Sequence, residues 1–263
     1  AIHSQPVRAP GELAGVLQQA LKAVKAGTAQ AIGVVSREQV ITRAVRFPST
    51  DPVELAHMVE LYARAQLPYP REQTVIDFHM VQQQDGFSTV AVVACQREVI
   101  DRYLAVFREA GVPLRVLTVS SWGVLGWYRQ LGRTPAEEPS LVVNIDDTRT
   151  DLVLLSGERV LSSRSLGQGA NDWSRSEDVV ELLALEVERS RAAVRRELPG
   201  TEARSLILTG LGELTQWERA LAQRLQLPVR VEEGLPPLRP SAGVEAPAIS
   251  PVVIGGLACS EPG

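Results

Sequence analysis

The polar turn "NIDDTRTD" at residues 144–151 lies between two apolar runs and holds side chains suited to binding a phosphate. The hydroxyls of Thr148 and Thr150 and the guanidinium of Arg149 can donate to an anion, and such a turn can also present main-chain amides. Asp146 and the carboxylate after it oppose this chemistry, because they repel a phosphate unless a cation intervenes. The residues alone therefore leave two interpretations open: a phosphate turn, or a hairpin turn whose Asp and Thr side chains bond to local main chain.

A second candidate is the glycine turn in "ILTGLGEL", residues 207–214, which joins a predicted strand to a predicted helix. Gly210 and Gly212 lack a Cβ, so a ligand could approach the main chain closely, and a helix N-terminus attracts anions. Glycine turns of this kind are also common where no ligand binds. The pattern alone is a weak signal.

Composition excludes several other classes of site and partner. The chain has 263 residues and a formal net charge of -4, which gives no support for a nucleic-acid surface. Cys95 and Cys259 lie far apart, and the three histidines are isolated, so no metal-ligand spacing is present and a reducing compartment is favoured. No apolar run is long enough for a transmembrane helix. The chain begins with Ala1 inside what reads as the end of a strand, so we expect it to be truncated at its N-terminus.

Hydrophobic periodicity predicts alternating helices and strands along the chain, which indicates an α/β or mixed α+β protein. The predicted helices are residues 11–25, 49–67, 97–111, 121–131, 177–198, 215–226 and 250–259. The predicted strands are residues 29–36, 39–47, 73–84, 87–95, 112–120, 141–145, 150–156, 158–166, 204–210 and 227–233. Thr50 or Asp51 can cap the second helix, Gly111 can end the third, and Ser174 with Glu177 can form a capping box before the fifth.

A stretch rich in Pro, Gly and charge, "GRTPAEEP" at residues 132–139, is the preferred boundary between two halves. The turn "QDG" at residues 84–86 predicts a hairpin in the first half. Both candidate turns therefore lie in the second half. One joins two predicted strands, and the other leads from a predicted strand into a predicted helix.

The order of four segments resembles the PilM family of actin-like, FtsA-related type IV pilus assembly proteins. These segments are "VITRAVRFPSTDPVELAHMVELYARAQLPYPREQTVIDF", "STVAVVACQREVIDRYLAVFREAGVPLRVLTV", "NIDDTRTDLVLL" and "ILTGLGEL". The GspL cytoplasmic domain of type II secretion is similar. The most specific piece is "ARAQLPYPREQTVIDF", a helix, a proline-flanked aromatic and a strand that holds an Asp. The ordered motifs span about residues 29 to 258.

This resemblance implies an α/β protein with an actin-like (ribonuclease H-like) fold, truncated at the N-terminus, that carries an inserted 1C-like α+β subdomain. By the same comparison, the parts of the chain are a remnant of the first actin-like subdomain at 1–39, the inserted subdomain at 40–119, a linking helix and linker at 120–138, and the second actin-like half at 139–263.

The resemblance also assigns the two turns to a nucleotide site. Residues 144–151 would be the second phosphate loop, and Thr209 to Gly212 the adenosine-side turn. Family members read Asp-Ile-Gly where this chain has Asn144 and Asp146, so a carboxylate and a close-approach glycine are both missing. A first phosphate loop has no counterpart after Ala1. We therefore expect a degenerate site without ATP hydrolysis, formed by Asn144, Asp146, Thr148, Thr150, Asp151, Thr209, Gly210 and Gly212.

The function implied is a non-catalytic cytoplasmic scaffold, peripheral at the inner membrane, of a type IV pilus or type II secretion assembly. It would bind the N-terminal tail of a bitopic PilN-like partner in a groove lined by Val45, Phe47, Leu55 and Val59, positions that any core would also contain. No cofactor, metal or nucleic acid is expected. The alternatives are an actin-like protein that binds ATP and Mg²⁺, perhaps as a slow ATPase, and an interaction module of an unrelated assembly.

Overall fold

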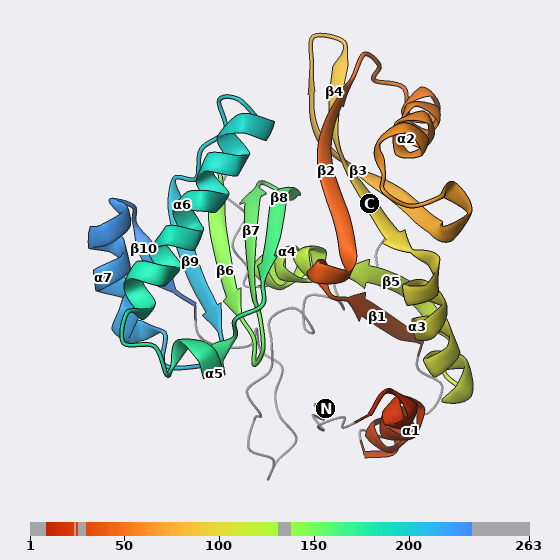
Figure 1. Ribbon diagram of the computed structural model, residues 1–263, viewed down its shortest axis with the longest axis horizontal. Helices are drawn as coiled ribbons and strands as arrows, with labels where there is room; N and C mark the ends of the chain where they lie inside the picture. Colours follow the sequence, from red (N-terminus) through yellow and green to blue (C-terminus); the bar gives the residue numbers. More distant parts are fainter. Residues whose placement is uncertain (1–8, 24, 26–29, 131–137, 233–263) are drawn as a thin grey trace.

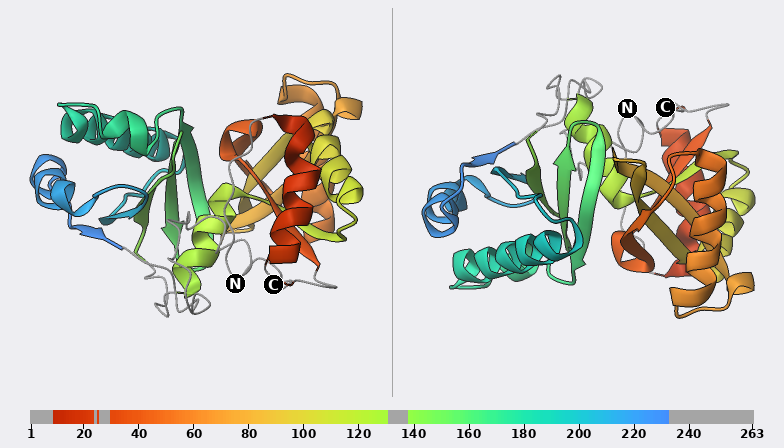
Figure 2. Two further views of the ribbon diagram at one scale, coloured as in Figure 1. Left: turned by 90° about the horizontal axis from the view of Figure 1, so that it is seen from below. Right: turned by 90° about the horizontal axis from the view of Figure 1, so that it is seen from above.

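A computed structural model describes residues 9–23, 25, 30–130 and 138–232 of the chain (Figure 1). Within these residues the strands form three sheets: a five-stranded sheet, a three-stranded antiparallel sheet and a parallel pair. Figure 2 shows the five-stranded sheet with its helices on one side of the molecule, the other two sheets on the other side, and α4 (Ser120–Gln130) between them. The predicted α/β class is confirmed.

The five-stranded sheet has the order β10-β9-β6-β7-β8. Its strands are β6 (Ser140–Ile145), β7 (Thr150–Ser156), β8 (Arg159–Leu166), β9 (Ser205–Gly210) and β10 (Val229–Val231). β6, β7 and β8 are antiparallel neighbours, and β9 and β10 add in parallel on the side of β6. β6 and β7 are buried at every position, as expected for strands that are covered on both faces.

Two helices cover one face of this sheet, and one helix covers the other. α6 (Val179–Glu197) and α7 (Thr215–Leu225) pack through Leu183, Val187 and Leu221 against side chains that alternate along β6, β7 and β9. α4 packs on the opposite face, where Trp127 is fully buried among the other set of alternating side chains. Side chains alternate between the two faces of a strand, so one set packs against α6 and α7 and the other set packs against α4.

The burial of α4 changes the role predicted for residues 120–138. We expected a linking helix followed by a linker, whereas Val124, Trp127 and Tyr128 belong to the core of the second half. Its apolar residues are spread around the helix, which is typical of a helix that is buried on most sides. The predicted linker 132–139 falls almost entirely outside the described residues.

The three-stranded sheet has the order β2-β4-β3 and is antiparallel. Its strands are β2 (Val40–Phe47), β3 (Thr74–Gln84) and β4 (Phe87–Gln96), and α2 (Pro52–Gln66) covers one face. The predicted hairpin is present: Asp85 and Gly86 have φ of 53° and 77°, which the tight turn between β3 and β4 requires. Asp51 caps α2 by accepting from the N–H groups of Val53 and Glu54 at 2.9 Å.

The remaining strands, β1 (Ala31–Val35) and β5 (Leu114–Val119), form a parallel pair. The inserted subdomain was expected to extend over 40–119, but β5 returns to β1, so the antiparallel sheet itself ends at Gln96. α3 (Arg97–Glu109) joins the two sheets, and α1 (Leu13–Ala23) lies beside α3. Gly111, at φ 71°, ends the turn after α3 as predicted.

Other sequence predictions differ in detail. The long helix begins at Val179 rather than 177, and no side chain caps its start, so the proposed pairing of Ser174 with Glu177 is wrong. Instead Ser174 follows a short helix, α5 (Ala170–Trp173), and its hydroxyl donates to Asn171 O at 3.2 Å. The described residues also form 3-10 turns at Pro10–Glu12, Arg37–Gln39 and Arg71–Gln73. The predicted helix at 250–259 lies outside the described residues.

Candidate functional site

The turn between β6 and β7 is closed by its own main chain. Asp146 N–H donates to Arg149 O at 2.8 Å, and Asp146 O accepts from Ala170 N–H at 2.8 Å. Asp147 and Thr148 at its tip are exposed, and Asp146 is half-buried. The polar turn is therefore tied to the segment that follows β8.

Gly169 shows how closely this segment approaches the turn. A Cβ added at Gly169 would lie 2.2 Å from Asp147 O and 2.3 Å from Thr148 N, closer than atoms without a bond between them can come. The main chain before α5 thus lies directly against the peptide of the turn, on the side where the hydroxyl of Thr150 is also engaged. Thr150 Oγ1 donates to Gln168 O at 2.8 Å and accepts from the indole N–H of the buried Trp173 at 2.8 Å.

Asp151 connects several elements through its side chain. Its carboxylate is 2% exposed and accepts from Ser120 Oγ at 2.7 Å and from Ser165 Oγ at 2.6 Å. Ser120 begins α4, and its Oγ also accepts from the main-chain N–H of Arg37 at 3.0 Å. Asp151 therefore joins β7, β8 and α4, and through Ser120 it reaches the first half of the chain.

Arg37 contributes a second link to the same region. Its guanidinium donates to Ser163 Oγ at 2.7 Å, to Ser163 O at 2.8 Å and to Val40 O at 2.8 Å. Burial lowers the pKa of Arg37 and the nearby Asp151 carboxylate raises it, so the two charges support each other across the boundary between the halves.

Arg149, the cation of the turn, points to the first half. It donates to Ser36 Oγ and forms an ion pair with Glu38 at 3.0 Å. Because Ser36 and Glu38 flank Arg37, three successive residues of the first half contact the turn, β8 or α4. The Arg149 guanidinium, which was predicted to be able to bind an anion, therefore pairs with a carboxylate of the protein itself.

Asn144 lies in the row of polar residues that crosses the sheet. Its register partners are Asp151 on β7 and Thr209 on β9, and all three are buried. Neither Oδ1 nor Nδ2 of Asn144 has a hydrogen-bond partner among the described residues. A buried amide without partners is uncommon, and a water or a ligand atom is the usual explanation.

The glycine turn packs against the same strand end. Gly210 has φ 113°, and a Cβ there would lie 2.1 Å from Ile145 O; the neighbouring Leu211 N–H donates to that oxygen at 2.7 Å. Gly212 has φ 100° but open surroundings, with Leu214 Cδ2 at 3.9 Å as its nearest neighbour. The structure thus brings both turns together at one end of β6.

Comparison with known proteins decides the family. The family model described as type IV pilus assembly protein PilM matches residues 1–223. The chain belongs to the PilM family. A solved "PilM-PilN type IV pilus biogenesis complex" is 23% identical, with a TM-score of 0.76, and the match covers 99% of this chain and 88% of that one. This likeness confirms the actin-like fold.

Two further structures resemble this PilM-family chain. The cytoplasmic domain of EpsL, an inner membrane component of the type II secretion system of Vibrio cholerae, is 14% identical with a TM-score of 0.51, covering 98% of this chain and 82% of that one. A Bacteroides thetaiotaomicron protein with an actin-like ATPase fold is 14% identical with a TM-score of 0.42, covering 82% and 76%. Membership of the PilM family makes the chain a type IV pilus assembly protein, and its fold is actin-like.

The residues predicted to line a partner groove lie on and under α2. Leu55 and Val59 are 0% and 3% exposed and form the core between α2 and the antiparallel sheet. Val45 and Phe47 are half-buried on β2, and the Phe47 ring meets Tyr62 edge to face at 6.2 Å. Only this second pair is accessible at the surface, so a docking role for Leu55 and Val59 would need α2 to move.

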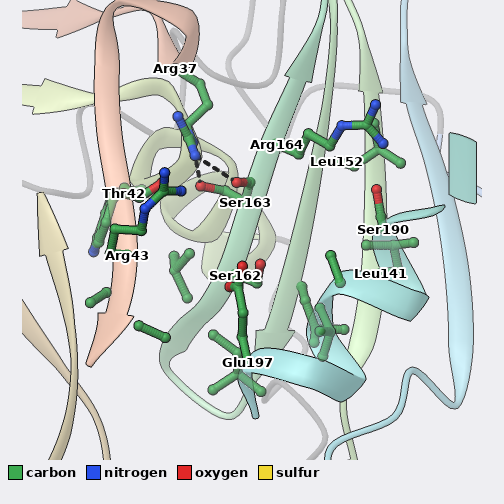
Figure 3. Close-up of a pocket in the computed structure, with 18 residues that line it drawn as sticks. Arg37, Thr42, Arg43, Leu141, Leu152, Ser162, Ser163, Arg164, Ser190 and Glu197 are labelled. Atoms are coloured by element: carbon green, nitrogen blue, oxygen red, sulfur yellow. Dashed lines mark hydrogen bonds between the residues drawn. The ribbon is translucent and has the colours of Figure 1, made fainter. Parts of the chain in front are cut away.

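A cleft that the sequence did not reveal lies between β2, β8 and α6 (Figure 3). Its volume is about 200 Å³, and its polar lining includes Arg37, Arg43, Arg164, Ser190 and Glu197. These residues come from the 3-10 turn Arg37–Gln39, β2, β8 and α6, and none belongs to a recognisable motif.

No group of three or more His, Cys, Asp or Glu side chains able to hold a metal occurs among the described residues. In the same part of the chain, no helix combines the length and apolar character needed to cross a membrane.

A pH-dependent contact lies at the boundary between the halves. His79 on β3 meets Trp122 on α4 edge to face, with ring centroids 5.9 Å apart. Burial lowers the pKa of His79 below its ordinary 6.5, Asp77 raises it and Arg159 lowers it.

We expect the free energy of unfolding to fall as the pH drops below about 6.5, because the unfolded chain then binds a proton that folded His79 resists. Urea unfolding between neutral and mildly acidic pH measures this slope. His79→Gln should flatten it, whereas His57→Gln, at an exposed position on α2, should not. Equal slopes for His79→Gln and the unmodified chain would contradict the assignment.

Proposed function

We propose that this chain is a non-catalytic scaffold of a type IV pilus or type II secretion assembly, which acts at the cytoplasmic face of the inner membrane. It binds the N-terminal tail of a bitopic PilN-like partner and hydrolyses no nucleotide. The proposal rests on family membership for the assembly and on the geometry of the polar turn for the absence of catalysis.

The main support for a non-catalytic role is that the polar groups of the turn already have bonding partners within the protein. Thr150 is shared between Gln168 and Trp173, and Arg149 is paired with Glu38. Gly169 lies against the tip of the turn, where a phosphate would have to approach the main chain. These groups do not fit a phosphate without losing partners, and Asp146 places a further carboxylate beside them.

The partner is supported by the composition of the complex that resembles this chain, which is named for PilM and PilN. Peptide tails dock along strand edges or in grooves between elements. Val45 and Phe47 offer a half-buried apolar surface on β2, where they pack beside Val59 and Tyr62 of α2. We place the tail on this surface.

Titration of a fluorescent peptide tail of the PilN-like protein from the same organism tests the partner. A saturable complex is expected, and Phe47→Ala should weaken it by about tenfold, since loss of one buried aromatic anchor costs roughly 1 to 2 kcal/mol. Phe87→Ala, which removes an exposed ring at the start of β4 beside the β3–β4 turn, serves as the control. If no complex forms with the tail peptide, the scaffold proposal is contradicted.

Nucleotide binding without hydrolysis is the second candidate, and one observation favours it. The buried amide of Asn144 has no partner among the described residues, and the main chain at Gly212 faces open space. A nucleotide atom could meet either group.

Calorimetric titration with ATP and Mg²⁺ separates the two candidates. We expect no heat of binding at micromolar concentrations, because a phosphate would have to displace Glu38 from Arg149. The tail peptide, titrated under the same conditions, is the positive control. Micromolar ATP binding that Asn144→Ala abolishes would replace the scaffold proposal with the nucleotide one.

A further inference from the structure

The cleft between β2 and β8 is bordered by two edge strands. β2 is the outer strand of the antiparallel sheet, and β8 is the outer strand of the five-stranded sheet. Figure 3 shows the two strands on either side of the cleft, with Arg37 reaching between them. An edge strand presents unpaired N–H and C=O groups, which make it a template for a further strand.

The hydrogen bonds of Arg37 show which main-chain carbonyl groups of β2 and β8 point toward the cleft. At one end of the cleft its guanidinium bonds to Val40 O on β2 and Ser163 O on β8, each at 2.8 Å. In an antiparallel ladder the N–H and C=O of one residue point to the same side, and alternate residues repeat the direction. The register of β2 with β4 is regular, so Thr42 and Ala44 present their main-chain groups to the same side as Val40.

The interior of the cleft suits a segment with small side chains. Apolar residues form its inner surface, among them Ala44, Ala91, Leu152 and Val194. A volume of about 200 Å³ corresponds to roughly six or seven waters, enough for a short stretch of extended chain. Ser190 on α6 lines this space, is 7% exposed, and its Oγ has no hydrogen-bond partner among the described residues.

The charges of the lining favour an acidic occupant. Three arginines, Arg37, Arg43 and Arg164, oppose one carboxylate, Glu197. Arg164 is neutralised by Glu186 at 2.7 Å, and Arg37 is bonded to carbonyl and hydroxyl oxygens. Arg43 is exposed, and no ion pair of Arg43 occurs within the described residues.

We propose that this cleft binds an extended segment of a partner protein, which adds as a strand to the edge of β2 and carries an acidic side chain opposite Arg43. The main-chain groups of Thr42 and Ala44 hold the segment, and Ser190 bonds to its inward side. This site differs from the surface proposed for the tail, because it uses the main-chain edge of β2, whereas the tail surface consists of the side chains of Val45 and Phe47 beside α2. It therefore goes beyond the proposed function.

Fluorescence anisotropy with two sets of short peptides tests the proposal. Both sets alternate Thr and Val between solubilising ends; one carries a Glu at successive positions, and the other carries Gln instead. We expect the best Glu peptide to bind the full chain about fivefold more tightly than its Gln counterpart, the scale of a single ion pair, and Arg43→Gln to remove that difference.

Thr42→Pro tests strand addition itself. It removes an N–H that faces the cleft and leaves the ladder with β4 intact, so binding should be lost while the circular dichroism spectrum is kept. Arg46→Pro is the matched control: its N–H faces the same side of β2, but Arg46 does not line the cleft. Ser190→Ala should weaken the binding of the Glu peptide without unfolding the chain.

Three results would overturn the proposal. Equal binding of the Glu and Gln peptides excludes the acidic contact. Full affinity in folded Thr42→Pro excludes strand addition. Complete displacement of the peptide by millimolar phosphate or acetate, with Thr42→Pro unaffected, identifies a site for small anions instead. None of these results bears on the tail-binding proposal. Competition between the tail peptide and the Glu peptide would show that both bind at the same site, which would contradict a separate site on β2.

Discussion

Replacing Gly210 by Ala should lower the free energy of unfolding by roughly 3 kcal/mol or more. The added Cβ would lie 2.1 Å from Ile145 O, and φ at this position is 113°. The turn after β9 would have to separate from the end of β6, which also breaks the bond from Leu211 N–H to Ile145 O. Urea unfolding followed by circular dichroism measures the loss.

Gly212→Ala is the matched control. It also has a positive φ, 100°, but its new Cβ would meet only Leu214 Cδ2, at 3.9 Å. Its cost is therefore limited to backbone strain of about 1 kcal/mol. Equal losses for the two variants would show that close packing against β6 is not what requires Gly210.

Asp151→Ala should destabilise the chain by about 3 kcal/mol, because the carboxylate accepts two hydrogen bonds from serine hydroxyls in a buried site. The variant removes the acceptor of Ser120 and Ser165 and the nearby negative charge that supports Arg37. The effect is structural, so it should appear in urea unfolding in the absence of any nucleotide.

Asp101→Ala, on the exposed face of α3, should change the free energy of unfolding by less than about 0.5 kcal/mol. A loss for Asp151→Ala that is no larger than this would mean that the Asp151 network contributes nothing measurable. The same pair, assayed for tail binding, separates a structural role of Asp151 from a role at the partner surface.

Local sequence signals predicted most of the elements, because they depend on neighbouring residues. Alternating β-branched residues defined the strands, and Asp85 with Gly86 defined the hairpin. The polar turn and the glycine turn were also found, since each interrupts an apolar run. Their closeness at the end of β6 follows from the pairing of β6 with β7 and β9, which residue spacing alone does not reveal.

Contacts between distant segments were missed for physical reasons. α4 looked like a link, because a short helix with apolar residues on all sides has no polar face to reveal what covers it. Asp151 contacts Ser120, which is 31 positions away, and Arg149 contacts Ser36, which is 113 positions away. Leu55 and Val59 carried the same pattern whether they lay in a groove or in a core, and burial placed them in the core.

The pairing of β1 with β5 has a consequence for how the chain folds. All of residues 36–113 lies between these two neighbouring strands, so their contact closes a long loop and is intrinsically slow to form. The β3–β4 hairpin closes over two residues and can form early. We expect the antiparallel sheet to assemble first and to bring β5 back to β1, so that substitutions in the hairpin slow refolding, whereas substitutions in β5 mainly accelerate unfolding.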